Sequence, residues 1–161
     1  MNMWPWSKSV LVLGVAAGAG LAAEKPQVIP PERLANYWLL AQAPDANAPN
    51  SGRNLDAPSC AAVSYVVEKD GSTSQAKLER LVPDGDLGKV AVGVVAGMRF
   101  AATKQNLGKD RVFTYVVIPF NLPDADSPNA ADRARRMQAL APCKLDNFGH
   151  ADKQVVPIVH K

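Results

Sequence analysis

A change of hydrophobic period between residues 60 and 123 constrains the fold more than any other feature of this chain. In Cys60–Glu68 one of the two alternating faces is wholly apolar or aromatic, and residues 72–81 alternate with half of the positions polar. A period of two predicts β-strands. The two stretches are joined through Asp70-Gly71, a pair that favours a tight hairpin because both turn positions tolerate positive φ. We therefore expect an antiparallel hairpin.

A helical period follows this hairpin. Pro83-Asp-Gly-Asp86 supplies an N-cap, with Asp86 placed to accept backbone N–H groups at the helix start. Residues 112–120 then return to a nearly continuous apolar run, and we expect a strand that is central or buried on both faces. The predicted fold class is α+β, with one main helix packed on a small antiparallel sheet. The helix would pack through apolar residues that recur at three- and four-residue spacing, namely Leu87, Val90, Ala91, Val94, Val95 and Met98.

The 161 residues support one small domain with an appendage at each end. We place the domain at residues 56–123. Residues 24–55 are rich in Pro, Ala and Asn and predict an arm or linker, in which only the apolar cluster 34–40 favours a short helix. Residues 124–161 predict a helical and irregular C-terminal extension.

The C-terminal extension carries local signals of its own. Ser127-Pro128-Asn129 precedes a helical stretch, Ala130–Leu140, which Pro142 ends. Its three arginines are expected to form one solvated helix face. Residues 155–160 favour a weak strand, which Pro157 confines to a sheet edge.

The first 23 residues predict a cleavable signal peptide. Val10–Ala23 is a 14-residue apolar run that follows one lysine and ends in small residues before the polar Glu24. A helix that spans a bilayer needs roughly 20 apolar residues, so we expect cleavage after Ala22 or Ala23 and a periplasmic protein. The alternative is an uncleaved segment that anchors the protein to the inner membrane, with two tryptophans at the membrane interface.

Two cysteines, Cys60 and Cys143, remain after the signal. In an oxidising compartment an even cysteine count predicts a disulfide. In the chain-entropy model, a loop of roughly 80 residues closed in this way contributes about 4 kcal/mol. Two free thiols, or a bridge between two chains, are the alternative. No C-x-x-C motif surrounds either cysteine, so neither is expected to be catalytic.

No combination of residues predicts catalysis, a cofactor or a metal site, and we do not expect an enzyme. His150 has Asp146 and Asp152 close to it in sequence, but no nucleophile accompanies them. His150, His160 and Asp152 also lack the spacing that zinc sites use. No basic stripe with interleaved aromatic residues predicts nucleic-acid binding. Arg99, at the end of the helical stripe, suits the negative end of the helix dipole.

The order of these elements resembles the C-terminal domain of the TonB family of energy transducers, in which a helix packs on a small antiparallel sheet. The resemblance is carried by three motifs in order. They are the strand and turn Val67-Glu-Lys-Asp70-Gly71, the helix end Met98-Arg99-Phe100, and the strand end Val117-Ile118-Pro119-Phe120.

The chain departs from that family in three features. Met98 replaces the tryptophan of the helix-end motif. The usual membrane-anchoring helix with its histidine is missing, and residues 24–57 lack the long Pro-rich spacer patterned with Lys and Glu. The resemblance therefore implies a TonB-like binding module without the means to transduce energy alone.

The resemblance also implies how such a module would bind. The family captures an extended peptide of outer-membrane transporters as an added strand at an exposed sheet edge. The expected partner is therefore an envelope protein, with an outer-membrane transporter and a role in transmembrane transport as one option; a homodimer stays open. The candidate peptide-binding edge is the last strand, at Val112, Thr114, Val116 and Ile118.

A different class of function stays open beside this one. The edge would then be covered by the protein's own arms, residues 28–40 or 155–159. In that case the protein is a self-capped structural or accessory protein of the periplasm with no energy-transducing role.

Overall fold

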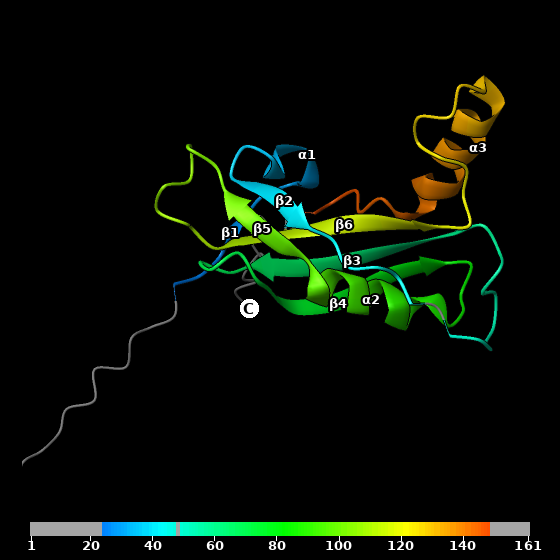
Figure 1. Cartoon of the computed structure of the whole chain (residues 1–161), viewed down its shortest axis with the longest axis horizontal. Coiled ribbons are helices and arrows are strands. Elements are labelled where there is room, and N and C mark those ends of the chain that lie inside the picture. The colour runs from blue at the N-terminus through cyan, green and yellow to red at the C-terminus, as the bar shows by residue number, and fades with distance from the viewer. Residues whose placement is uncertain (1–23, 48, 149–161) are drawn as a thin grey trace, which may run out of the picture.

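The computed structural model describes residues 24–47 and 49–148. They form a mixed α+β fold, as expected, with a four-stranded sheet, a two-stranded sheet and three α-helices (Figure 1). The strands are β1 (Gln27–Val28), β2 (Trp38–Gln42), β3 (Ser59–Val67), β4 (Thr73–Val82), β5 (Arg99–Ala102) and β6 (Val112–Phe120). The helices are α1 (Pro31–Leu34), α2 (Leu87–Gly97) and α3 (Ala130–Leu140), and a 3-10 turn, η1 (Ala141–Cys143), follows α3.

The larger sheet has the order β1-β6-β3-β4, with β3 antiparallel to both of its neighbours. The predicted hairpin is confirmed as β3 and β4, and its turn is closed by a hydrogen bond from Gly71 N to Glu68 O at 2.9 Å. Gly71 has a φ of +81°, and a Cβ at this position would lie 2.0 Å from Phe100 O. The turn and the close approach of a second strand therefore both require glycine here.

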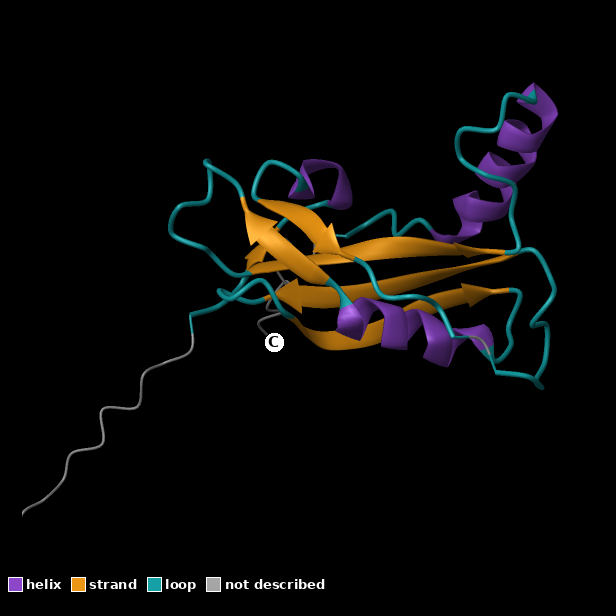
Figure 2. Cartoon of the chain, viewed as in Figure 1, coloured by secondary structure: helices purple, strands orange, loops and turns teal. Residues whose placement is uncertain are grey.

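The predicted main helix is confirmed as α2, which lies across one face of the sheet (Figure 2). Leu87, Ala91 and Val95 are buried against β3 and β4, whereas Val90 and Val94 are only half-buried. The helix is thus amphipathic, as expected, but its apolar stripe extends beyond the part of the helix that packs on the sheet.

The N-cap prediction at Asp86 needs correction. Asp86 occupies the N-cap position, yet its side chain makes no capping hydrogen bond to the helix. Its Oδ2 accepts instead from Arg53 N at 2.7 Å, and Asp86 N donates to Arg53 O at 3.2 Å. The carboxylate is drawn to a loop 33 residues away in sequence, which no local pattern signals.

The opposite face of the sheet is covered by the C-terminal extension. Cys60, Ala62 and Tyr115 are buried there together with Cys143, and the predicted Cys60–Cys143 disulfide is present, with a Cα–Cα distance of 6.1 Å. All nine residues of β3 are buried as a result. The strand buried on both faces is therefore β3, whereas the last strand, β6, lies between β1 and β3 and is central in the sheet order, as one of the two expectations had it.

The helix of the extension is confirmed as α3. Asn129 caps it, because its side-chain oxygen accepts from Ala131 N at 2.9 Å. The strand predicted within residues 155–160 lies outside the described residues.

Residues 24–55, expected to be an arm or linker, contribute three elements to the fold. Ile29 and Trp38 are 3% and 2% exposed, and Trp38 Nε1 donates to Asp110 O at 3.0 Å. The short helix expected at 34–40 is wrong: α1 ends at Leu34, and from Trp38 the chain forms β2, which pairs with β5. Burial of one tryptophan against a loop 72 residues away decides this outcome.

β5 occupies residues that the sequence pattern assigned to the end of the helix. Phe100 is buried, and its ring stacks on Tyr65 with centroids 5.9 Å apart. Phe100 N also donates to Gly71 O at 2.8 Å. These contacts pull the chain into a strand immediately after Met98.

Candidate peptide-binding edge

The outer side of β6 can be assigned from its hydrogen bonds. In an antiparallel pair, the main-chain groups of successive residues point alternately toward the partner strand and away from it. The carbonyls of Arg111 and Phe113 accept from Gln27 N at 2.8 Å and Ile29 N at 3.0 Å, on the side away from β3. The pairing of β6 with β3 has no irregularity, so odd-numbered residues direct their main chain outward along the whole strand.

This alternation changes which residues form the edge. Val112, Thr114, Val116 and Ile118 are even-numbered, so their N–H and C=O groups face β3. Three of these four side chains are buried, and Val112 and Ile118 belong to the core beneath α2. The outward-facing main chain belongs to Tyr115, Val117 and Pro119.

The sequence does hold one signal for this alternation. Pro119 has no N–H, so it fits β6 only where no ladder bond to a neighbouring strand is needed. It lies opposite Cys60 in the pairing with β3. Its position therefore marks the odd-numbered residues as those that face outward.

The first part of this edge is already covered. β1 pairs parallel with β6 at Gln27↔Val112 and Val28↔Phe113. Pro30 and Pro31 follow at once, and two residues without an N–H cannot extend a ladder. Among residues 24–47 and 49–148, no strand other than β3 pairs with β6 from Tyr115 to Pro119, so the outer side of this part has no partner strand.

An ion-pair network holds β1 in place. Arg111 Nε and Nη2 donate to Glu68 Oε2 and Oε1 at 2.6 and 2.8 Å, and Arg111 Nη1 donates to Glu24 O at 2.8 Å. Lys69 Nζ lies 3.0 Å from Glu24 Oε2. The hydrogen bond from Arg111, helped by one from Ser74, lowers the pKa of Glu68 below its usual range. The covered end of the edge is therefore fixed by charge as well as by the ladder.

A hollow of about 290 Å³ lies beside the open part of the edge. It is lined by residues 30–32, by Tyr115, and by residues 144–146 and Phe148 of the C-terminal extension. The ring of Phe148 lies 4.8 Å from that of Tyr115 and 5.2 Å from that of Phe113. An extended chain added along β6 would pass this hollow.

The other edge of the sheet, β4, is less suited to strand addition. No strand in the described part of the chain pairs with its outer side. However, its pairing with β3 is interrupted twice, and Gln75 has a positive φ of 54°. Lys77, Glu79 and Arg80 place three charges along the strand. Bulges and charged side chains are common protections of an edge against further pairing.

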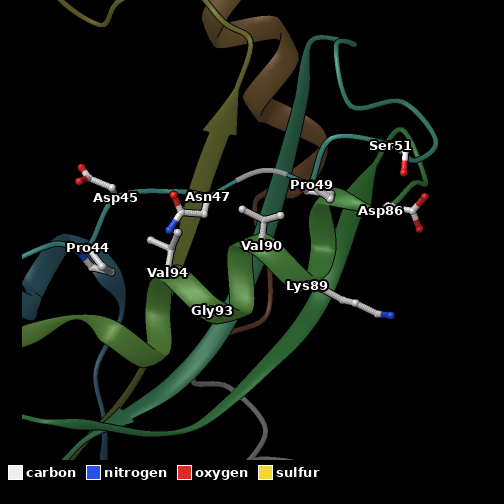
Figure 3. A pocket seen from close by; sticks show the side chains of 10 residues that line it. All are labelled: Pro44, Asp45, Asn47, Pro49, Ser51, Asp86, Lys89, Val90, Gly93 and Val94. Carbon is white, nitrogen blue, oxygen red and sulfur yellow. The ribbon is translucent and has the colours of Figure 1, made fainter.

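A second hollow, of about 700 Å³, lies between α2 and the segment around Pro44 and Pro49. Val90 and Val94 point from the helix toward this segment, whereas Lys89 points away from it (Figure 3). The hollow accounts for the half-buried part of the helix stripe.

Other predicted sites have the following places. Within the described residues, no group of three His, Cys, Asp or Glu side chains could hold a metal ion, and His150, Asp152 and His160 lie outside them. Arg99 Nη1 donates to Ala96 O at 3.4 Å and to Met98 O at 2.8 Å, at the C-terminal end of α2.

No helix in the described part is long and apolar enough to cross a membrane. The predicted signal peptide is outside that part.

No protein-family model matches this chain, and no curated protein matches it.

Proposed function

We propose that this protein is a binding module of the cell envelope that captures an extended peptide by strand addition at the outer edge of β6. One observation carries the proposal. β1 ends at Val28 and covers only the first two residues of β6, and Pro30-Pro31 follow soon after, so the outer side of β6 from Tyr115 to Pro119 has no partner strand among the described residues.

The open edge offers a short ladder to a peptide. The N–H groups of Tyr115 and Val117 and the carbonyls of Tyr115, Val117 and Pro119 point outward by the alternation of β6. Each hydrogen bond made there contributes about 0.5–1.5 kcal/mol after competition with water. Main-chain bonds of this kind supply affinity, and side chains on alternate positions supply specificity.

The resemblance to the TonB C-terminal domain supports the kind of partner. A hairpin (β3 and β4), a helix on its face (α2) and a later strand (β6) follow one another as the resemblance implies, with the short strand β5 inserted between α2 and β6. On this ground we propose an envelope protein as the partner, with an outer-membrane transporter as the first candidate. The disulfide supports an oxidising compartment such as the periplasm.

A second candidate function is a self-capped structural protein. The parallel pairing of β1 with β6, held by Arg111, Glu68 and Glu24, favours it. The protein's own arm already occupies one end of the edge in this structure. The two candidates differ in whether the rest of the edge accepts another chain.

A pair of proline substitutions separates the two candidates. Val117→Pro removes an outward N–H and no bond of the β3 ladder, so the fold should persist while strand addition is lost. Val116→Pro is the matched control, because it removes an N–H that faces β3 and should destabilise the sheet. Circular dichroism and thermal unfolding would check both variants.

Binding would be read in intact envelopes with a photoreactive amino acid at Lys144, which lines the hollow beside the edge. We expect a crosslink to an envelope protein in the otherwise unchanged chain and its loss in folded Val117→Pro. A crosslink of undiminished yield in folded Val117→Pro would contradict strand addition and favour the self-capped protein.

A further inference from the structure

We infer that the peptide captured at β6 carries a lysine or arginine that enters the hollow beside Tyr115. This inference rests on the proposed function and adds the chemical class of the ligand. The hollow lies where β1 ends and the open edge begins, because its lining includes both Pro30-Pro31 and Tyr115. A peptide cannot pair along this edge without placing a side chain near it.

The lining favours a cation for two independent reasons. The half-buried ring of Phe148 packs on the buried ring of Tyr115, with centroids 4.8 Å apart and a tilt of 55°, and an aromatic ring such as that of Phe148 attracts ammonium and guanidinium groups. Glu32 and Asp146 add two carboxylates, and neither forms an ion pair with a residue of the described ranges. A carboxylate accepts charge-assisted hydrogen bonds from such a cation.

One cationic side chain, Lys144, also lines the hollow, but the net charge of the lining remains negative. Lys144 contributes a single positive charge against the two carboxylates, which leaves a net charge of −1 among the lining side chains. Its side chain is exposed, so it can extend into solvent when another cation arrives. An acidic peptide residue would instead meet Glu32 and Asp146.

The sheet geometry predicts a second position of the peptide. Side chains at every second residue share one face of a sheet, so a peptide residue opposite Tyr115 and one opposite Val117 lie on the same face. Val117, Leu140 and Leu145 all pack against the buried cluster that contains Tyr115 and Cys143 on that face. We therefore expect the basic residue to be followed or preceded, two positions away, by an apolar one.

The test uses the full chain and three blocked, dye-labelled seven-residue peptides. They are Thr-Thr-Lys-Thr-Val-Thr-Thr and two versions with Glu or Gln in place of Lys. Fluorescence polarisation would give each dissociation constant at low and at physiological salt. We expect the Lys peptide to bind about five- to tenfold more tightly than the Glu peptide, as for partly exposed charge pairs, with the difference reduced by salt.

Two charge-reversal variants locate the effect. Asp146→Lys should weaken binding of the Lys peptide and remove its advantage over the Glu peptide. Asp45→Lys makes the same charge change beside α2, at the second hollow, and should leave the ratio unchanged. An equal loss of preference in both variants would overturn the inference, because it would reflect net charge alone.

The outcomes separate this inference from the function on which it rests. Equal affinity for all three peptides, lost in Val117→Pro, would keep strand addition and overturn the preference for a cation. No binding of any peptide would contradict both. In a further outcome, the peptides would bind only when Val155→Asp is introduced into the tail. Residues 153–155 (Lys-Gln-Val) of this chain would then be the occupant of the edge, and the proposal of a separate partner protein would be wrong.

Discussion

The guanidinium of Arg111 and the carboxylate of Glu68 form a two-pronged ion pair that joins the start of β6 to the end of β3. The two hydrogen bonds measure 2.6 and 2.8 Å, and the side chains are 17% and 26% exposed. A third bond from the same guanidinium, to Glu24 O, reaches the residue that leads into β1. One side chain thus connects the hairpin, the last strand and the N-terminal arm.

Loss of this pair should destabilise the fold. We expect Glu68→Gln to lower the free energy of unfolding by about 1–3 kcal/mol. The charge-assisted hydrogen bonds from the Arg111 guanidinium to the carboxylate would be replaced, in a partly buried place, by weaker bonds to a neutral amide. Urea unfolding would measure the change. Lys77→Gln is the matched control, since its pair with Glu79 is 71% exposed at the lysine and should contribute less than about 1 kcal/mol. Equal losses in both variants would contradict a special role for Arg111.

The same pair predicts an acid-dependent loss of stability. The pKa of Glu68 is lower in the folded protein than its ordinary value of 4.5, chiefly through the hydrogen bond from Arg111. Its contribution is therefore complete above the unfolded-state pKa and is lost as pH falls through the folded-state pKa. We expect the stability of Glu68→Gln to fall less steeply between about pH 5 and pH 2 than that of the unchanged chain. Identical slopes would exclude this linkage. Glu79 and Asp70, whose pKa values are also lowered, contribute to the remaining slope.

Two glycines should respond in opposite directions to alanine. A Cβ at Gly93 of α2 meets no atom within 4 Å, so Gly93→Ala should stabilise the protein by about 0.5–1 kcal/mol through helix propensity. Gly71→Ala should destabilise it, because the new Cβ would lie 2.0 Å from Phe100 O at a φ of +81°. Thermal unfolding of both variants would check the prediction, and a lower melting temperature for Gly93→Ala would contradict it.

Two threonines form another matched pair. Thr114 is fully buried, and its Oγ1 has no hydrogen-bond partner among the described residues. Thr114→Val removes that unpaired hydroxyl at nearly constant shape, so we expect unchanged or higher stability. Thr73 Oγ1 donates to Val95 O at 2.7 Å, and Thr73→Val should cost about 0.5–1.5 kcal/mol. Denaturant unfolding would rank the two, and the reverse order would argue for a partner at Thr114.

The disulfide should also make a substantial contribution to stability. Cys60 and Cys143 are separated by 83 residues, and closing so long a loop restricts the unfolded chain. We expect a Cys60→Ala, Cys143→Ala double variant to lose about 2–4 kcal/mol of stability. Mass spectrometry of the exported chain without reductant would test the bond itself. Two alkylatable thiols there would contradict it.

The sequence by itself determined the elements whose signals are local. The Asp70-Gly71 turn, the period of α2 and the Asn129 cap of α3 all depend on residues within a few positions of one another. Such signals survive in any tertiary context that does not oppose them. The cysteine count predicted the bridge for a similar reason, because only one intramolecular pairing of two cysteines exists.

Only the tertiary structure decided the remaining elements and the residues of the candidate edge. β1, β2 and β5 pair with partners far away in sequence, and their few residues carry no periodic signal. Asp86 was predicted to cap α2, but it binds Arg53, because a carboxylate accepts from whichever N–H the fold brings near. The outward side of β6 likewise depends on which strand lies beside it, since a shift of one residue exchanges its two sides. Pro119 restricted that choice, and the pairing with β3 and β1 fixed it.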